Sequence, residues 1–304
     1  LFMEVVKKRV GIIRGGNVGD HNASVLNGGE LGLHLFENLN HKYKVVDIFV
    51  DKNGIWHIGG IKTEIANLPN QVDVVWNTAH PSISNPVRSL ALPLIDISSF
   101  SYLLKQGHDL FQNQIKDLGI KTPKRIIFPL HREDLDGDVE NYVIRKAQEV
   151  HQKFSAPWII KSFNKDIDMG IHVAKTFPEL ADAILDGVVH RDSILVEEFI
   201  SGKNTSIHSV SGFRGQDIYL FPPENISKEN KIELERLTKE LHRHLGAEHY
   251  LKTDFTVHPK RGVFLTDISL HPDLKEGSHF HKNCESVGAK MHHVIEHMID
   301  RVTR

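Results

Sequence analysis

The stretch YLKTDFTVHPKRGVFLTDISLHP, from Tyr250 to Pro272, decides the fold of this chain. Its first half alternates between apolar and polar residues, and a polar turn with Pro259 and Gly262 leads into a second apolar run. Alternation with a period of two is typical of a half-buried strand, and a turn of this composition joins two strands into a hairpin. We therefore predict two paired strands. The two faces of the first strand would carry Leu251, Thr253, Phe255 and Val257 on one side and Lys252, Asp254 and Thr256 on the other.

Two carboxylates, Asp254 and Asp267, interrupt these apolar strands. A half-buried carboxylate is costly without a cation or a hydrogen-bond partner. Two of them on paired strands predict a seat for Mg²⁺, with phosphate oxygens filling the remaining coordination positions. The spacing leaves open the alternative of two aspartates at the surface edge of a sheet.

The composition excludes several classes of protein. The chain has 304 residues, of which 40% are hydrophobic and 25% charged, as in a soluble protein of about two domains. A net charge of −2 predicts no attraction to nucleic acid or to a membrane surface. No run approaches the roughly 18 apolar residues of a membrane span, and the N-terminal residues lack the pattern of a signal peptide. The single Cys284 fits a reducing compartment, so we expect a cytoplasmic protein.

The first segment has the pattern of an α/β unit. A short apolar strand at residues 9–14 leads through the glycine-rich loop GGNVGDHN into a helix at residues 23–38. A strand, a glycine loop and a helix N-terminus together form a geometry that collects anions, although GGNVGD is not the GxGxxG of dinucleotide-binding proteins. Further strands are expected at residues 43–50 and 73–78. The glycines either face a ligand or only make a turn at the edge of a doubly wound sheet, and both interpretations stay open.

From residue 98 onward the order of the elements changes. The order helix, strand, helix, strand, strand, helix, strand predicts an α+β unit instead of a second doubly wound sheet. One of these strands ends at Lys161, and the strand at residues 193–200 ends in acidic residues. The last segment adds two strands, a charged helix near residues 227–245, the hairpin and a C-terminal helix at 288–302. We predict three subdomains, 1–97, 98–192 and 193–304, with a cleft between the last two.

Six segments of the chain are similar in sequence to motifs of one enzyme family and occur in the same order. They are GGNVGDHNASVLNG, WNTAHP, LGIKTP, PWIIK followed by GIHVAK, ILVEEFISGKN, and the hairpin. Together they resemble the D-alanine–D-alanine ligases of the ATP-grasp superfamily nearly from end to end. The resemblance implies an ATP-grasp fold, in which an N-terminal doubly wound α/β subdomain precedes two α+β subdomains that enclose a nucleotide cleft. It also implies the family reaction, in which ATP phosphorylates a carboxylate and an amine then attacks the acyl phosphate.

The resemblance assigns nucleotide and metal roles to individual residues. Lys161 would bind the phosphates of the nucleotide, and Asn204 would bind its ribose. The adenine would be bound by a hinge made of Glu197, Glu198, Phe199 and Ile200. The implied cofactors are ATP and Mg²⁺, with Mn²⁺ as an alternative ion. The metal would be held by Asp254, Asp267 and Ser269.

The resemblance also assigns residues to the reacting groups. Lys252 would stabilise the transferring phosphoryl group, Asp20 would bind the ammonium of the first substrate, and His80 would lie beside the acyl site. The implied partners are small amino-acid substrates, D-alanine by default. A homodimer is compatible with the resemblance.

Several family motifs are altered in this chain. The serine-glycine phosphate lid is replaced by SFNKDIDM at residues 162–169, which lacks the glycines that let backbone N–H groups approach phosphate. Lys252 replaces an arginine and therefore lacks the planar fork of a guanidinium. Asn204 and Asp267 replace glutamates, and Ser269 replaces an asparagine. The loop that closes over the substrates is shortened to LFPPENI at residues 220–226. Two hypotheses follow, an active but divergent carboxylate–amine ligase and a non-ligating protein that binds a nucleotide or another ligand.

The chain is also rich in histidine, with 21 residues of this type. His271, His279 and His281 follow the predicted metal strand, and His293 and His297 are four residues apart on the last helix, a spacing that suits a metal. A transition-metal site here would favour Mn²⁺ or Zn²⁺ over Mg²⁺. The alternative is a set of histidines without a metal role.

Overall fold

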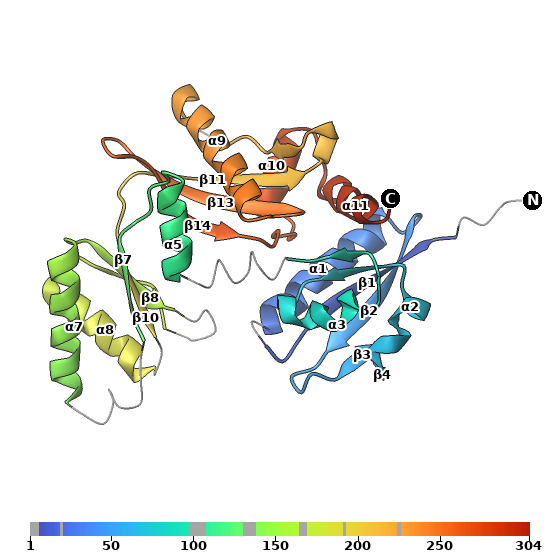
Figure 1. The fold of residues 1–304 in the computed structure, drawn as a ribbon, viewed down its shortest axis with the longest axis horizontal. Coiled ribbons are helices and arrows are strands. Elements are labelled where there is room, and N and C mark those ends of the chain that lie inside the picture. The colour runs from blue at the N-terminus through green and yellow to red at the C-terminus, as the bar shows by residue number, and fades with distance from the viewer. Residues whose placement is uncertain are drawn as a thin grey trace, which may run out of the picture. The chain divides into compact units, whose positions relative to one another are not determined.

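The computed structural model describes residues 6–18, 21–97, 108–129, 138–163, 169–190, 193–223 and 226–304 (Figure 1). The chain divides into two compact units. Unit 1 comprises Leu1–Gln114, Thr205–Phe255 and Asp267–Arg304, and unit 2 comprises Ile115–Asn204 and Thr256–Thr266. The predicted division into three subdomains at residues 97 and 192 stays a prediction. Among the described residues, no helix is both long enough and apolar enough to cross a membrane.

The N-terminal part of unit 1 is built on a six-stranded sheet. Its strands lie in the order β4-β3-β2-β1-β5-β6. Their bounds are β1 (Lys8–Gly15), β2 (Tyr43–Val50), β3 (Trp56–Ile58), β4 (Ile61–Lys62), β5 (Val74–Asn77) and β6 (Leu94–Ile95). The four strands β2, β1, β5 and β6 are parallel, and β3 and β4 extend the sheet as an antiparallel edge.

Helices cover both faces of this sheet. Successive residues of β1 point to opposite faces, so its apolar side chains contribute to two separate cores. Val10 and Ile12 belong to a core shared with α1 (His21–Asn38) and α11 (Met291–Val302), whereas Ile13 belongs to a separate core on the other face. The second face is covered by the short helices η1 (Ile65–Asn67), α2 (Leu68–Gln71), η2 (Pro81–Ser84) and α3 (Asn85–Arg88). The predicted doubly wound α/β architecture is therefore confirmed.

The predicted hairpin lies in a four-stranded sheet of the order β12-β11-β13-β14. Leu251, Thr253 and Phe255 are at most 1% exposed, so these residues of the predicted apolar face are buried, whereas Val257 is only partly buried. The boundary between the units crosses β11, β13 and β14. The elements of this part are β11 (Lys203–Ser211), η3 (Phe213–Gly215), β12 (Ile218–Leu220), α9 (Lys228–His244), β13 (Tyr250–His258), β14 (Gly262–Ser269) and α10 (His279–Ser286).

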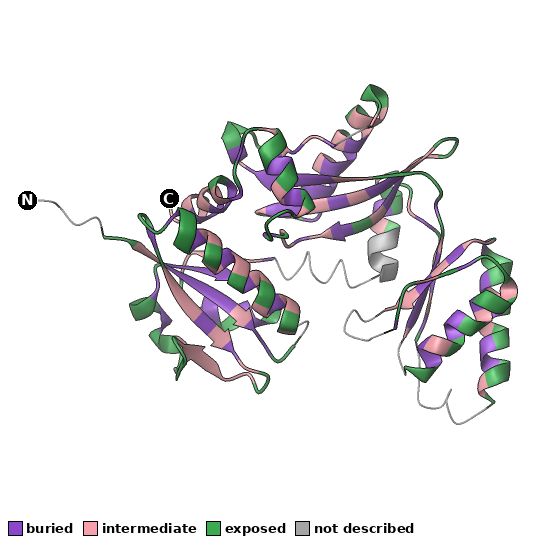
Figure 2. Ribbon diagram, turned by 180° about the vertical axis from the view of Figure 1, so that it is seen from behind, coloured by how far each residue is buried: buried purple, intermediate pink, exposed green. Residues whose placement is uncertain are grey.

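Unit 2 contains a four-stranded sheet of the order β7-β10-β8-β9, in which neighbouring strands are antiparallel. The strands are β7 (Arg125–Phe128), β8 (Trp158–Ser162), β9 (His172–Ala174) and β10 (Ile194–Glu198). The helices α7 (Val139–Lys153) and α8 (Phe177–Val189) bury one side in the core of this sheet and expose the other, as Figure 2 shows. The helix α5 (His108–Asp117) precedes β7.

Side-chain caps explain where several helices begin. Asp138 accepts hydrogen bonds from the backbone at the start of α7, and Thr176 forms a reciprocal capping box with Glu179 at the start of α8. Ser227 and Ser278 each accept one backbone hydrogen bond at the start of α9 and α10. Such caps satisfy N–H groups that have no partner within the helix.

Candidate active site

The polar face of β13 places a cation beside a carboxylate. Lys252 Nζ donates a hydrogen bond of 3.0 Å to Asp254 Oδ2, and the Ser206 hydroxyl of β11 donates to the other oxygen, Oδ1. Both members of the ion pair are partly buried, with side-chain exposures of 30% and 26%. The expectation that this strand carboxylate has a polar partner is therefore confirmed.

The same face continues along both strands as a ladder of polar pairs. Asn204 and Ser206 on β11 bond to Thr256 and Asp254 on β13. From the first pair to the second, the residue number on β11 increases by two while the residue number on β13 decreases by two, as expected for antiparallel strands. On the opposite face, Thr253 bonds to a threonine of α9, so the helix covers that side. The polar ladder thus lies on the side of the sheet that α9 leaves free.

A buried histidine extends the ladder toward α10. His208 Nδ1 lies 2.7 Å from the Tyr250 hydroxyl, and His208 Nε2 lies 2.7 Å from His279 Nδ1. Burial, helped by the nearby His279 and Lys252, lowers the pKa of His208 well below its ordinary value, so this imidazole is neutral at pH 7. Burial also raises the pKa of Tyr250 well above 10. Sequence reasoning missed His208 and Tyr250, although their parity places them on the face of Ser206 and Lys252.

The other two predicted metal ligands lie on β14, the strand next to β13. Asp267 is exposed on this edge strand, so the prediction that it is half-buried is wrong, and the Ser269 hydroxyl donates to the backbone oxygen of His271 at 3.0 Å. In the described part of the chain, no three His, Cys, Asp or Glu side chains come together as a metal site. Carboxylate and hydroxyl oxygens are nevertheless the hard donors that Mg²⁺ takes, and Mg²⁺ commonly binds through one or two carboxylates plus substrate phosphate. The residues therefore fit an ion that arrives with a nucleotide.

The C-terminal histidines have protein partners instead of gathering around one point. His279 bonds to His208, His281 Nδ1 lies 3.7 Å from a Glu285 oxygen, and His297 Nε2 lies 2.8 Å from the Ser211 backbone oxygen. The backbone N–H of Lys290 donates to His293. These contacts favour the interpretation without a metal role for the described histidines.

In unit 2, one buried carboxylate joins two cations. Glu197, on β10, is 5% exposed. Its Oε1 lies 3.0 Å from Nη2 of Arg125, and its Oε2 lies 2.6 Å from Nζ of Lys161. Two of the predicted nucleotide residues, Lys161 and Glu197, are therefore in direct contact. Sequence reasoning missed Arg125, because its pairing with Glu197 depends on the register of β7 with β10.

The remaining predicted hinge residues, Glu198, Phe199 and Ile200, follow Glu197 in the chain. Burial favours a higher pKa for Glu198, but a hydrogen bond from Arg261 and a second from the Lys124 N–H outweigh it and hold that pKa below its ordinary value. The backbone N–H groups of Glu198 and Phe199 donate to the oxygens of Lys124 and Pro157. Ile200 is buried, and Phe199 is 39% exposed. An adenine base would thus have to bind other backbone groups of the hinge or displace these two bonds.

The glycine loop lies at the carboxyl end of β1, between β2 and β5. The connection after β1 leads to β2, whereas the connection after the neighbouring strand β5 leads to β6 on the other side, and such a switch point is where open α/β sheets bind ligands. Gly15 has φ +89°, and a Cβ there would lie 2.3 Å from the Val50 oxygen, so a close approach requires glycine. The Gly15 N–H donates to Ser24 in α1, which fixes the loop on the helix.

His80 follows β5 and lies at the start of η2. Its Nδ1 accepts a hydrogen bond from the Ser82 N–H and lies 2.7 Å from the Ser82 hydroxyl. Burial lowers the pKa of this partly buried imidazole. Asp20, predicted on the neighbouring loop, lies outside the described residues, as do residues 164–168 of the predicted phosphate lid.

Individual proteins and solved structures match the chain over nearly its whole length, although no family model matches it. A D-alanine–D-alanine ligase of Oceanobacillus iheyensis is 19% identical over 361 residues, an alignment that covers 97% of this chain and 95% of the relative. The crystal structure of D-alanyl-alanine synthetase A from Vibrio cholerae superposes with a TM-score of 0.75 at 13% identity and covers 98% of both chains. That of a Bacillus anthracis D-alanine–D-alanine ligase complexed with ATP gives 0.69 at 16% identity, covering 97% of this chain and 96% of its own.

Over nearly its whole length the chain is similar to D-alanine–D-alanine ligases at low sequence identity, and it shares their fold. The predicted resemblance and the predicted ATP-grasp fold are both confirmed. Lys252 and Asp254 lie in the hairpin, and Glu197 and Asn204 lie in ILVEEFISGKN, two of the six segments that resemble the ligases. Lys161 and Asp254 belong to different units, so the common cleft between them stays a prediction.

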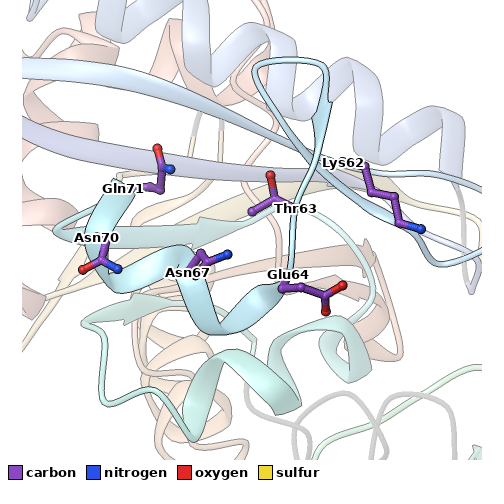
Figure 3. A pocket seen from close by; sticks show the side chains of 6 residues that line it. All are labelled: Lys62, Thr63, Glu64, Asn67, Asn70 and Gln71. Atoms are coloured by element: carbon purple, nitrogen blue, oxygen red, sulfur yellow. The ribbon is translucent and has the colours of Figure 1, made fainter.

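A pocket elsewhere in unit 1 has no part in this constellation. It has a volume of about 510 Å³ and lies between β4 and α2 (Figure 3). None of the predicted site residues lines it. Its lining consists of Lys62, Thr63, Glu64, Asn67, Asn70 and Gln71.

Proposed function

We propose that the chain is an ATP-dependent carboxylate–amine ligase that joins two small amino acids, with D-alanine as the default substrate. One observation carries the proposal. Lys252, Asp254 and Asp267 lie on adjacent strands of a fold that matches D-alanine–D-alanine ligases over 98% of the chain. A lysine paired with one strand carboxylate, with a second carboxylate on the neighbouring strand, supplies the charges that phosphoryl transfer needs, because charge must be neutralised while a phosphoryl group moves.

The reaction would proceed in two steps. An oxygen of the first amino acid's carboxylate attacks the γ-phosphorus of ATP, so the bond to ADP breaks and an acyl phosphate forms. The amine of the second amino acid then attacks the acyl carbon, phosphate leaves with the original carboxylate oxygen, and the amine gives up its proton. Splitting the reaction in this way replaces a poor leaving group by phosphate.

The residues of unit 1 take the roles that act on the reacting groups. Lys252 would stabilise the transferring phosphoryl group, Asp20 would bind the first ammonium group, and His80 would lie beside the acyl carbon. Asp254, Asp267 and Ser269 would hold Mg²⁺, which would supply charge neutralisation at the phosphates. The ion pair between Lys252 and Asp254 supports this assignment, because it keeps both side chains on the same face of β13.

The residues of unit 2 would bind the nucleotide. Lys161 would bind the α- and β-phosphates, the segment from Glu197 to Ile200 would bind adenine, and Asn204 would bind the ribose. The 36% exposure of the Lys161 side chain supports its role, since a phosphate can reach it.

The altered lid has a chemical consequence. A site without the glycine-rich lid and with a shortened substrate loop excludes water less well, so water competes with the amine for the acyl phosphate. We expect a high KM for the amino acids and some ATP hydrolysis without an acceptor.

A screen of amino acids and divalent metals, with phosphate release as the readout, tests the proposal. D-Alanine with ATP and Mg²⁺ should release phosphate and form a dipeptide. Release with L-amino acids alone would keep the enzyme and discard the substrate. ATP binding without release for any pair and any metal would contradict the ligase and favour a non-ligating nucleotide-binding protein.

Two further expectations belong to the proposal. We expect a cytoplasmic location because the single Cys284 fits a reducing compartment, and fractionation of the source cells would test it. A homodimer remains a prediction, and sedimentation analysis of the full chain would test it.

A further inference from the structure

The Glu197 cluster is a three-charge group inside unit 2. The carboxylate has two oxygens and gives one to each cation, Oε1 to Arg125 at 3.0 Å and Oε2 to Lys161 at 2.6 Å. The Glu197 side chain is 7% exposed. A buried carboxylate is unfavourable unless it is paired, so at least one of these cations has to stay in contact with it.

The two cations are not equivalent. Arg125 is the direct partner of Glu197 in the pairing of β7 with β10. Lys161 is offset by two residues, because the direct partner of Glu197 on β8 is Ile159. The Arg125 side chain is 15% exposed and the Lys161 side chain 36%. Arginine is thus the inner partner, and lysine is the partner that solvent and a ligand can reach.

One donor of the Arg125 side chain, the Nε–H group, is buried and has no hydrogen-bond partner among the described residues. The Nε and one Nη of a guanidinium form a planar fork whose spacing matches the two oxygens of a carboxylate. Arg125 already uses Nη2 on Oε1, so a small rotation of the carboxylate would bring Oε2 to the unused Nε.

We propose that Arg125 is a positioning residue that keeps Glu197 paired while Lys161 exchanges its carboxylate for a nucleotide phosphate. The inference rests on the proposed nucleotide site and adds a residue to it. In the structure Lys161 is held by Glu197. When a phosphate arrives, the lysine moves to it, and the Arg125 Nε takes the oxygen that the lysine leaves. A lysine at position 125 could not do this, because an ammonium group lacks the second donor in the plane of the fork.

The exchange is tested with ATP as the probe on the full chain. Calorimetry gives the Kd of ATP, and acetylation of Lys161 by a small activated ester, read by mass spectrometry, gives the accessibility of its amine. In the wild-type protein, saturating ATP should slow acetylation of Lys161. Arg125→Lys should weaken ATP binding by about tenfold, because Glu197 then holds Lys161 more firmly. The double variant Arg125→Lys with Glu197→Gln should recover most of that loss, since a neutral amide does not hold the ammonium group. Arg145→Lys, on the exposed side of α7, is the matched control and should bind ATP as the wild type does.

A second measurement covers an Arg125→Lys variant that fails to fold. Without ATP, Glu197→Gln alone should raise the rate of Lys161 acetylation, because the carboxylate no longer occupies the amine. Three results would overturn the inference: an Arg125→Lys variant that binds ATP within about twofold of wild type, a double variant with no recovery, and a wild-type Lys161 that ATP does not protect. The outcomes also separate this inference from the proposed function. Protection of Lys161 without phosphate release for any amino-acid pair removes the ligase and leaves the exchange, whereas phosphate release that is insensitive to Arg125→Lys removes the exchange alone.

Discussion

Lys252 and Asp254 form an ion pair on one face of β13, with 3.0 Å between Nζ and Oδ2. The hydroxyl of Ser206 donates to the second oxygen of the same carboxylate. The group proposed to hold the metal is thus oriented by the group proposed to stabilise the transferring phosphoryl. A change at either residue therefore disturbs both roles.

Asp254→Asn should lower phosphate release by about a hundredfold or more, because an amide binds Mg²⁺ less well and no longer attracts Lys252. The measurement is steady-state phosphate release with ATP, D-alanine and Mg²⁺. Asp217→Asn is the matched control, since Asp217 is an exposed aspartate that pairs with Arg243 at the surface of unit 1. Asp254→Asn activity close to that of Asp217→Asn would rule out the metal assignment.

Lys161→Ala should weaken ATP binding by about tenfold to a hundredfold, the loss expected when a charge-assisted contact to phosphate disappears. Calorimetry with ATP measures it. Lys153→Ala removes an exposed lysine of α7 that pairs with Glu149 and should leave the affinity unchanged. Equal affinities for the two variants would place any nucleotide elsewhere on the protein.

The hairpin and the main helices could be predicted from the sequence because their patterns are local. Strand alternation in LKTDFTV correctly separated buried Leu251 from the polar Lys252 and Asp254. The edge strands β3 and β4 were missed because each has too few residues to show a period. The helix α10 was not predicted, because its histidines were interpreted as candidate ligands and its buried side consists only of Phe280, Asn283 and Cys284.

The contacts of the candidate site could not be predicted in the same way. Arg125 meets Glu197 across two strands that are far apart in the sequence, and the pairing depends on their register. His208 and His279 come from a strand and a helix whose relative placement is set by packing. The sequence could indicate which residue types were available, but the partners follow from tertiary structure.

Gly15→Ala should destabilise the protein by about 2 kcal/mol or more, because φ is +89° and the new Cβ would lie 2.3 Å from the Val50 oxygen. The measurement is the free energy of unfolding in urea. Gly29→Ala is the matched control, since this glycine lies within α1 and a Cβ there meets nothing within 4 Å. It should stabilise the protein by about 0.5 to 1 kcal/mol through helix propensity. A tolerated alanine at position 15 would contradict the close approach in the loop.

His249→Phe should stabilise the protein, most strongly in acid. Both ring nitrogens of His249 are buried without a hydrogen-bond partner in the described part of the chain, and burial, with Arg301 nearby, lowers its pKa to about 4. As the pH falls from 6.5 to 4, the unfolded chain binds this proton before the folded protein does. The free energy of unfolding of the wild type therefore decreases through this window, by up to about 3 kcal/mol for this residue, and phenylalanine removes that decrease.

His242 supplies the contrast for this prediction. Its pKa is also lowered to about 4 by burial, but its two nitrogens bond to Ser209 and Ser211. His242→Phe should destabilise the protein at pH 7, because it leaves two buried hydroxyl groups without these bonds. Urea unfolding at pH 7.5 and pH 5 measures both variants. A His249→Phe variant with the same pH dependence as the wild type would show that His249 does not titrate as described.

Oxygen transfer tests the ligase proposal most directly. D-Alanine labelled with ¹⁸O in its carboxylate is incubated with the full chain, ATP and Mg²⁺, and the released phosphate is examined by mass spectrometry. If the carboxylate attacks the γ-phosphorus and phosphate then leaves from the acyl carbon, each phosphate released with dipeptide carries one ¹⁸O. Phosphate without the label, or dipeptide formed without labelled phosphate, would contradict an acyl-phosphate ligase.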